Sequence, residues 1–218
     1  MPDDPSIRLV CFDLGRVLVR ICDDWQQACG IAAVPFPAVL ADRAVRERFQ
    51  ELTALGDVGK LGFDEFLQSA SQILSLPADQ IRAAQEAYLR PAYTGSIELL
   101  DQLSARGIKT ACLSNTSENH WRIMSDPGHT SHVPLHKLDY QFASHLVGHR
   151  KPDAAIYEHV ERTTGFAGEQ ILFFDDVIEN VQAATRRGWH AHRIDPAPDD
   201  PIPQIRAVLA RFNLRHDA

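Results

Sequence analysis

Residues 7–18 constrain the fold more than any other stretch of the chain. The apolar run that opens this stretch lacks the alternation of a half-buried strand, so residues 7–13 are predicted to form a strand buried on both faces of a parallel sheet. The run ends in Asp13 and, two positions on, Gly15. A carboxylate just past a buried strand lies where open α/β sheets bind ligands. Because Asp and Gly are also common turn residues, this stretch alone leaves both interpretations open.

The composition bounds the class of protein. With 218 residues, 44% of them hydrophobic and 23% charged, the chain has room for one large domain or a core with a smaller partner. The net charge of -7 offers no basic surface to nucleic acid. No apolar run is long enough to cross a membrane, and the acidic start lacks the order of a signal peptide. The four cysteines have no metal-type spacing, so reduced thiols and a cytoplasmic location are expected.

The pattern changes after a short apolar stretch at 17–21, which is interpreted as a small hairpin or flap. From 23 to 90 the apolar spacing is helical and no strand is predicted. Four helices are expected, at 23–30, 37–55, 63–74 and 77–89, with a glycine-rich break at 56–62. This arrangement indicates a helical domain of residues 21–91 inserted into a core formed by residues 1–20 and 92–218.

Strands and helices alternate again in the second half of the chain. Strands are expected at 108–113, 140–143, 171–174 and 189–194, and helices at 96–106, 152–164, 180–187 and 201–212. Together with the first strand, this order predicts an α/β fold with a Rossmann-like, doubly wound parallel sheet.

Polar residues follow the predicted strands at one edge of this sheet. They are Asp13, Ser114 with Asn115, and Asp175 with Asp176, and Lys151 adds a cation at the start of a helix. None of these signals is strong alone, but their combination predicts a site for phosphate and magnesium. Asp13 is expected to be the nucleophile that forms an aspartyl phosphate.

Each of the remaining residues has an expected role in that chemistry. The metal ligands are expected to be Asp13, the backbone carbonyl of Gly15, and Asp176 helped by Asp175. Ser114 and the amide of Asn115 are expected to bind the phosphoryl oxygens, while Lys151 neutralises developing charge. Asn180, one helical turn after Asp176, is expected to orient either that carboxylate or Lys151.

These motifs resemble those of the haloacid dehalogenase superfamily, and the resemblance covers nearly the whole chain. The matching stretches are Phe12-Asp13-Leu14-Gly15-Arg16-Val17, Leu113-Ser114-Asn115-Thr116, Arg150-Lys151-Pro152, and Phe174-Asp175-Asp176 with Asn180. The resemblance implies a magnesium-dependent aspartyl-phosphate hydrolase whose helical insertion is a cap domain. The nearest branch is the epoxide-hydrolase-N-domain-like group, which includes a bacterial phosphatase of α-D-glucose 1-phosphate.

One position departs from the family pattern. Most phosphatases of the family carry a second Asp two positions after the nucleophile, as general acid and base, and here that position is Gly15. Loss of a general acid costs roughly 10²–10⁴ in rate. Three explanations stay open: a substrate with a good leaving group such as a sugar 1-phosphate, a proton from a cap side chain or water, or a protein that mainly binds its ligand. The resemblance favours the first.

Several other residues carry two interpretations. Arg16 either touches substrate or is exposed, and Asp23 and Asp24 are expected to be helix caps rather than proton donors. Seven of the ten histidines lie between 120 and 159, where structural roles are expected over a zinc site. The Gly59-Lys60 stretch is either a loop over the site or a simple turn between helices.

The expected function is hydrolysis of small phosphorylated metabolites, sugar phosphates first, with Mg²⁺ as cofactor. No nucleic-acid or membrane partner is expected, and the chain is expected to be a monomer or a homodimer. A 2-haloacid dehalogenase is the first alternative, but it needs no metal, and an acidic pair facing Asp13 without a cation would be repulsive. A weakly active or non-catalytic phosphate-binding protein is the second alternative, because of Gly15.

Overall fold

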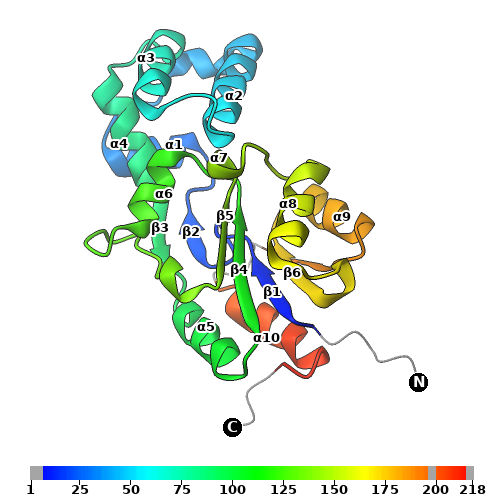
Figure 1. Ribbon diagram of the computed structural model, residues 1–218. Coiled ribbons are helices and arrows are strands. Elements are labelled where there is room, and N and C mark those ends of the chain that lie inside the picture. The colour runs from blue at the N-terminus through cyan, green and yellow to red at the C-terminus, as the bar shows by residue number, and fades with distance from the viewer. Residues whose placement is uncertain (1–6, 196–199, 215–218) are drawn as a thin grey trace.

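A five-stranded parallel sheet forms the centre of the computed structural model, which describes residues 7–195 and 200–214 (Figure 1). The strand order is β5-β4-β1-β6-β7. The strands are β1 (Leu9–Phe12), β4 (Lys109–Ser114), β5 (Tyr140–Ala143), β6 (Ile171–Asp175) and β7 (His190–Arg193). The doubly wound α/β sheet predicted from the sequence is therefore confirmed. The acidic residues at the start of the chain lie outside the described residues.

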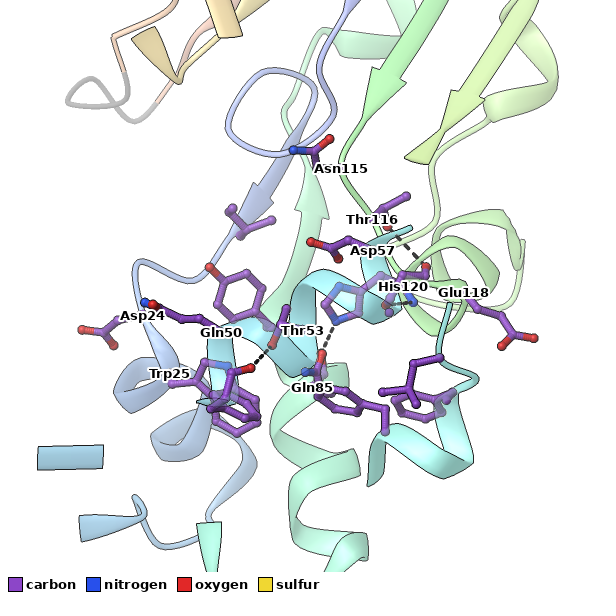
Figure 2. Close-up of a pocket in the computed structure, with 18 of the residues that line it drawn as sticks. Asp24, Trp25, Gln50, Thr53, Asp57, Gln85, Asn115, Thr116, Glu118 and His120 are labelled. Atoms are coloured by element: carbon purple, nitrogen blue, oxygen red, sulfur yellow. Dashed lines mark hydrogen bonds between the residues drawn. The ribbon is translucent and has the colours of Figure 1, made fainter. Parts of the chain in front are cut away.

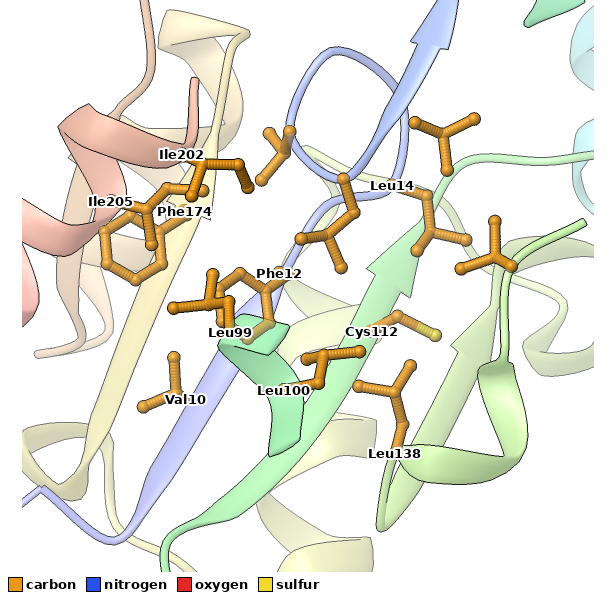
Figure 3. Packing of buried hydrophobic residues seen from close by; sticks show 14 of the residues in the cluster. Val10, Phe12, Leu14, Leu99, Leu100, Cys112, Leu138, Phe174, Ile202 and Ile205 are labelled. Atoms are coloured by element: carbon orange, nitrogen blue, oxygen red, sulfur yellow. The ribbon is translucent and has the colours of Figure 1, made fainter. Parts of the chain in front are cut away.

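Helices bury both faces of the sheet. Along β1, Val10 and Phe12 join one apolar cluster, and Leu9 and Cys11 join another, all four with no solvent exposure. The first cluster packs against α5 (Ser96–Ala105) and α10 (Ile202–Arg211), as Figure 3 shows, and the second against α8 (Ala154–Thr164) and α9 (Ile178–Arg186). Burial on both faces explains why the first strand has no polar alternation.

The strand register brings the ends of three central strands together. Phe12 pairs with Cys112 of β4 on one side and with Phe174 of β6 on the other. The amide of Asp13 donates to the carbonyl of Phe174 at 2.8 Å, which extends the ladder to the residue after β1. The residues that end these strands therefore meet at one edge, as parallel sheets require.

The helical insertion consists of α1 (Trp25–Ala32), α2 (Arg43–Asp57), α3 (Phe63–Leu74) and α4 (Ala78–Tyr88). These helices have an apolar cluster of their own, which includes Phe49, Phe66 and Leu74. In Figure 1 they gather at one end of the molecule. None of the helices in the described residues is long and apolar enough to cross a membrane.

Two expectations about this part of the chain were wrong. Leu89–Ala92 is a strand, β3, which pairs antiparallel with β2 (Val19–Ile21), although no strand was predicted before residue 90. Its sequence contains Pro91 and no β-branched residue, so local propensity does not indicate a strand. The helix predicted at 37–55 is a 3₁₀ turn at Ala38–Ala41 followed by α2, because Asp42 caps α2 by accepting from the amide of Ala44 at 2.7 Å.

Two short helices complete the edge that faces the insertion. They are α6 (Glu118–Ser125), which follows the Ser-Asn-Thr-Ser run, and α7 (Ser144–Val147). The connection from α2 to α3 packs on α7 through Gly59, which has a positive φ of 68°. A Cβ at Gly59 would lie 2.2 Å from the carbonyl oxygen of His145, so only glycine fits this approach.

We expect Gly59→Ala to destabilise the protein by about 1–3 kcal/mol, because alanine is strained at this φ and collides with the backbone of α7. Gly62→Ala is the matched control in the same connection, since a Cβ there meets nothing within 4 Å. Urea unfolding of both variants measures the difference. Equal stabilities would contradict the close contact.

Candidate active site

Three carboxylates converge where β1 and β6 end. Asp13 follows β1, Asp175 is the last residue of β6, and Asp176 comes next. One oxygen atom from each of the three lies within 4.8 Å of the others. Their side chains are 13%, 0% and 10% exposed, so the group is nearly shielded from water.

Lys151 lies between Asp13 and Asp175 and neutralises part of their charge. Its Nζ lies 3.0 Å from Oδ1 of Asp13 and 2.6 Å from Oδ2 of Asp175, and only 1% of its side chain is exposed. Burial works against the charge of Lys151, but the two carboxylates outweigh it and raise the pKa above the usual lysine range. The lysine is therefore held as a cation.

Asp175 has a fixed set of partners. Nδ2 of Asn180 donates to both of its oxygens, at 3.0 and 3.1 Å, and the amide of Val177 donates to Oδ1 at 2.8 Å. Asn180 was expected to orient Asp176 or Lys151, and instead it orients Asp175. This difference arises because the first turn of α9 aims Asn180 back at the end of β6. The oxygens of Asp175 thus already have hydrogen-bond partners, while Asp13 and Asp176 flank it.

The electrostatics of the group leave an excess of negative charge. Burial raises the pKa of Asp13 to about 7, with further contributions from Asp175 and Asp176, although Lys151 opposes the rise. Burial, with Asp175 next, also raises the pKa of Asp176. Lys151 and Arg16, which lies 3.6 Å from Asp176, supply two positive charges against three carboxylates. Clustered carboxylate oxygens are the donor set that Mg²⁺ prefers, so these residues fit a magnesium ion.

The loop after β4 is tied to Lys151 by a reciprocal pair of hydrogen bonds. Nδ2 of Asn115 donates to the carbonyl of Lys151 at 2.9 Å, and the amide of Lys151 donates to Oδ1 of Asn115 at 2.8 Å. Ser114, the last residue of β4, is 4% exposed beside them. The structure therefore brings together the residues of three separate loops, as the strand-end rule predicts.

Arg16 is partly exposed and forms ion pairs with two carboxylates. Its guanidinium lies 3.6 Å from Oδ2 of Asp176 and 3.3 Å from Oδ1 of Asp23, and its φ is 57°. Arg16 therefore links Asp176 to the start of the insertion. Asp24, as expected, caps α1 by accepting from the amide of Gln27 at 2.8 Å.

Gly15 sits against the wall of a large cavity. A Cβ at this position would lie 3.2 Å from Cδ1 of Ile21, so a longer side chain would press on Ile21. Ile21 also lines a cavity of about 850 Å³ between the insertion and the sheet edge (Figure 2). Asn115 and Arg150, the neighbours of Ser114 and Lys151, line the same cavity. The cavity therefore reaches the residues next in sequence to Ser114 and Lys151, while Asp13, Asp175 and Asp176 are not part of its lining.

Both sides of this cavity supply polar side chains, and the insertion adds aromatic ones. The insertion supplies a chain of aromatic contacts, in which Trp25 meets Phe49 edge-on at 5.0 Å and Phe49 lies 6.1 Å from Phe66. The sheet side supplies polar residues: Asn115, Thr116, Ser117, Glu118, His120 and Arg150. The volume is in the upper part of the range of ~300–1,000 Å³ that is typical of small-molecule sites.

Sequence reasoning missed one buried carboxylate in this cavity. Asp57, the last residue of α2, is 15% exposed and lies 3.6 Å from Nη1 of Arg150. Burial raises the pKa of Asp57 to about 6, although Arg150 opposes the rise. From the sequence, Asp57 is predicted only as part of the glycine-rich break at 56–62. An acidic residue between two glycines at the end of a helix was the available signal.

Several histidines between 120 and 159 have structural partners. Nε2 of His120 pairs with the carbonyl of Gln85 at 2.8 Å, and Nδ1 of His145 pairs with the carbonyl of Thr116 at 3.0 Å. In the part of the chain that the structure describes, no histidine belongs to a cluster of three potential metal ligands. The four cysteines are free and buried.

Comparison with known proteins identifies relatives of this architecture. Residues 7–188 match the family model described as haloacid dehalogenase-like hydrolase. A phosphatase from Mycobacterium tuberculosis is 27% identical over 135 residues, and a sesquiterpene phosphatase from Aspergillus oryzae is 29% identical over 133 residues. Each alignment covers 60% of this chain, and the chain spans 60% and 65% of those two relatives.

Solved structures share the fold. A haloacid dehalogenase family enzyme from Bacteroides thetaiotaomicron, in complex with magnesium and inorganic phosphate, matches with a TM-score of 0.72 at 21% identity, over 89% of this chain and 97% of that one. L-2-haloacid dehalogenase from Xanthobacter autotrophicus matches with a TM-score of 0.61 at 20% identity, over 97% and 90%. At these identities the likeness concerns the fold alone.

The raised pKa of Asp13 makes a prediction for the metal-free protein. An acid whose pKa is higher in the folded state loses folding stability as pH rises from its unfolded value, 3.8, to its folded value, about 7. We therefore expect metal-free Asp13→Asn to be more stable than wild type at pH 8, on the order of a few kcal/mol, and the two to converge towards pH 4.

Urea unfolding in chelator across this pH range makes the measurement. Asp64→Asn is the control, because that carboxylate is 89% exposed and should show no such gain. Parallel stability curves for wild type and Asp13→Asn would contradict the account of the site.

Proposed function

Because this chain belongs to the haloacid dehalogenase-like hydrolase family, we propose that it is a magnesium-dependent phosphatase of small phosphorylated metabolites, with Asp13 as nucleophile. The observation that carries the proposal is the arrangement of Asp13, Asp175 and Asp176 around Lys151. The group combines a carboxylate nucleophile, a fixed ammonium and a donor set suited to Mg²⁺. The names of the two phosphatase relatives agree with this activity.

In this mechanism each residue acts on the phosphoryl group from its own loop. Asp13 attacks phosphorus and forms an aspartyl phosphate, which water then hydrolyses. Lys151, Ser114 and the loop amide of Asn115 bind the phosphoryl oxygens and stabilise the charge that develops on them. A bound Mg²⁺, held by Asp13, Asp176 and the carbonyl of Gly15, would offset the repulsion between the carboxylate and the phosphoryl group.

Asp175 and Asn180 take supporting roles in the proposal. Asp175 holds Lys151 at 2.6 Å, and Asn180 holds Asp175. This refines the expectation that Asp175 is a direct metal ligand, since its oxygens already accept three hydrogen bonds from Asn180 and the amide of Val177. Arg16 positions Asp176 through the 3.6 Å ion pair.

The helical insertion is proposed to act as a cap. In this division residues 21–91 form the cap, and residues 1–20 and 92–218 form the core. The organic part of the substrate would bind in the cavity between them, where closure excludes bulk water. Sugar phosphates are the first candidates, and the aromatic side contributed by Trp25 and Phe49 also suits an apolar group such as the one in the name of the fungal relative.

We expect Asp13→Asn to abolish phosphate release while leaving the fold intact, because an amide cannot act as the nucleophile. The assay is a panel of sugar phosphates and apolar organic monophosphates with Mg²⁺, followed by phosphate release. Circular dichroism and urea unfolding check the fold, and Asp64→Asn serves as the active control.

Three outcomes count against the proposal. Full turnover by wild type in excess chelator would show that the reaction does not need a metal ion. Halide release from 2-chloropropionate without Mg²⁺ would favour a 2-haloacid dehalogenase. Tight Mg²⁺-dependent binding of phosphate compounds with no release across the panel would favour a non-catalytic ligand-binding protein.

A further inference from the structure

The proposed function leaves one proton without a carrier. When the bond from phosphorus to the ester oxygen breaks, the leaving oxygen needs a proton, and the water that later attacks phosphorus must lose one. Gly15 has no side chain for either transfer, and Ile21 limits the room for one. If a side chain is the carrier, it comes from another element that borders the cavity.

The carboxylates of the cavity wall differ in their surroundings. Asp24 caps α1 and is exposed, and Glu118 is exposed at the first turn of α6. Asp57 is the buried one, with 15% of its side chain exposed. In Figure 2 it lies on the cavity side of α2, between the position of Asn115 and that of Gln85. A buried carboxyl group keeps its proton more readily than an exposed one.

The other titratable side chains on the wall are less suited to the task. Burial lowers the pKa of His120, and its Nε2 is committed to the carbonyl of Gln85. Burial raises the pKa of Tyr88 above the ordinary tyrosine value, so its hydroxyl is a poor acid at neutral pH. Asp57 remains as the carboxyl group that can both give and accept a proton near neutrality.

The fold holds Asp57 in place from two sides. Arg150, the residue before Lys151, lies 3.6 Å from Oδ2 of Asp57 and ties the end of α2 to the loop that carries Lys151. Two residues on, Gly59 packs on the carbonyl of His145, which fixes the chain after α2 against α7. These contacts cross from the helical insertion to the core and hold the carboxyl group in the same cavity as Asn115 and Arg150.

We propose that Asp57 is the general acid and base of this enzyme, supplying from the helical insertion the carboxyl group that Gly15 lacks. The inference rests on the proposed function. In the first step, Asp13 bonds to phosphorus, the ester P–O bond breaks, and the proton of Asp57 passes to the leaving oxygen. In the second step, Asp57 takes a proton from water, whose oxygen bonds to phosphorus while the P–O bond to Asp13 breaks. Phosphate leaves, and both carboxyl groups return to their initial states.

The charges that face Asp57 agree with this role. The cation next to it is Arg150, and Arg46, Asp24, Glu118 and His120 line the rest of the cavity. Burial sets the pKa of Asp57 at about 6 against the effect of Arg150. A catalytic acid works best when its pKa lies near the operating pH.

The test compares two substrates of nearly the same shape, phenyl phosphate and p-nitrophenyl phosphate. Phenolate needs a proton to leave, whereas p-nitrophenolate needs little help. Comparing the loss of kcat/KM on the two substrates therefore distinguishes the loss of a general acid from other effects. For Asp57→Asn we expect kcat/KM on phenyl phosphate to fall roughly 10²-fold or more. On p-nitrophenyl phosphate we expect kcat/KM to fall less than about 10-fold. We expect kcat on this substrate to be low, because the base for the second step is missing.

Two further variants separate chemistry from structure. Arg150→Met removes the ion pair and keeps the carboxyl group, so we expect its losses on the two substrates to be equal. In wild type, kcat/KM on phenyl phosphate should fall as pH rises past about 6, the pKa of Asp57. That fall should move to higher pH in Arg150→Met and vanish in Asp57→Asn. Asp64→Asn is the exposed carboxylate control, and urea unfolding checks all folds.

Equal losses of Asp57→Asn on the two substrates, or the same substrate pattern in Arg150→Met, would overturn the proposal. So would an unchanged pH profile in Asp57→Asn. Failure of the proposed function gives a different result. Wild type would then release phosphate from neither substrate, or Asp13→Asn would keep its activity.

Discussion

The ion pairs of Lys151 with Asp13 and Asp175 are the interaction on which the rest of the site depends. Removing the lysine from such a buried group costs about 3–5 kcal/mol, because uncompensated negative charge is left behind. The chain supports the lysine on both sides, through the reciprocal hydrogen bonds with Asn115 and through Asn180, which fixes Asp175. The cost of burying these charges is partly offset inside the fold, and the remaining carboxylate charge suits the proposed cation.

The sheet edge and the helical insertion contribute different side chains to the site. The sheet edge is rigid and polar, since its loops leave strands that are buried on both faces. The helical insertion presents an aromatic cavity side and the carboxyl group of Asp57. Contacts of Gly59 with α7 and of Asp57 with Arg150 join the two parts. Under the proposed function, phosphate chemistry and substrate selection can therefore vary separately on one scaffold.

Much of this could be predicted from the sequence, because the rule that places ligands at the ends of parallel strands needs only the strand order. It located Asp13, Ser114 and Asp175 correctly at one edge. The partner of Asn180 could not be predicted, since it depends on the phase of α9 over the sheet. The position of Asp57 depends on how the insertion folds back, which no local pattern encodes. β3 was missed for a related reason, because pairing with β2 rather than propensity makes it a strand.

The central claim is that one divalent cation completes the charge balance between Asp13 and Asp176. Anomalous diffraction from crystals grown with Mn²⁺ in place of Mg²⁺ tests it most directly. The account predicts a single strong peak bound by Asp13 and Asp176, with Lys151 still paired to Asp175. The absence of a peak at this edge of the sheet, with the metal bound elsewhere or not at all, would contradict it.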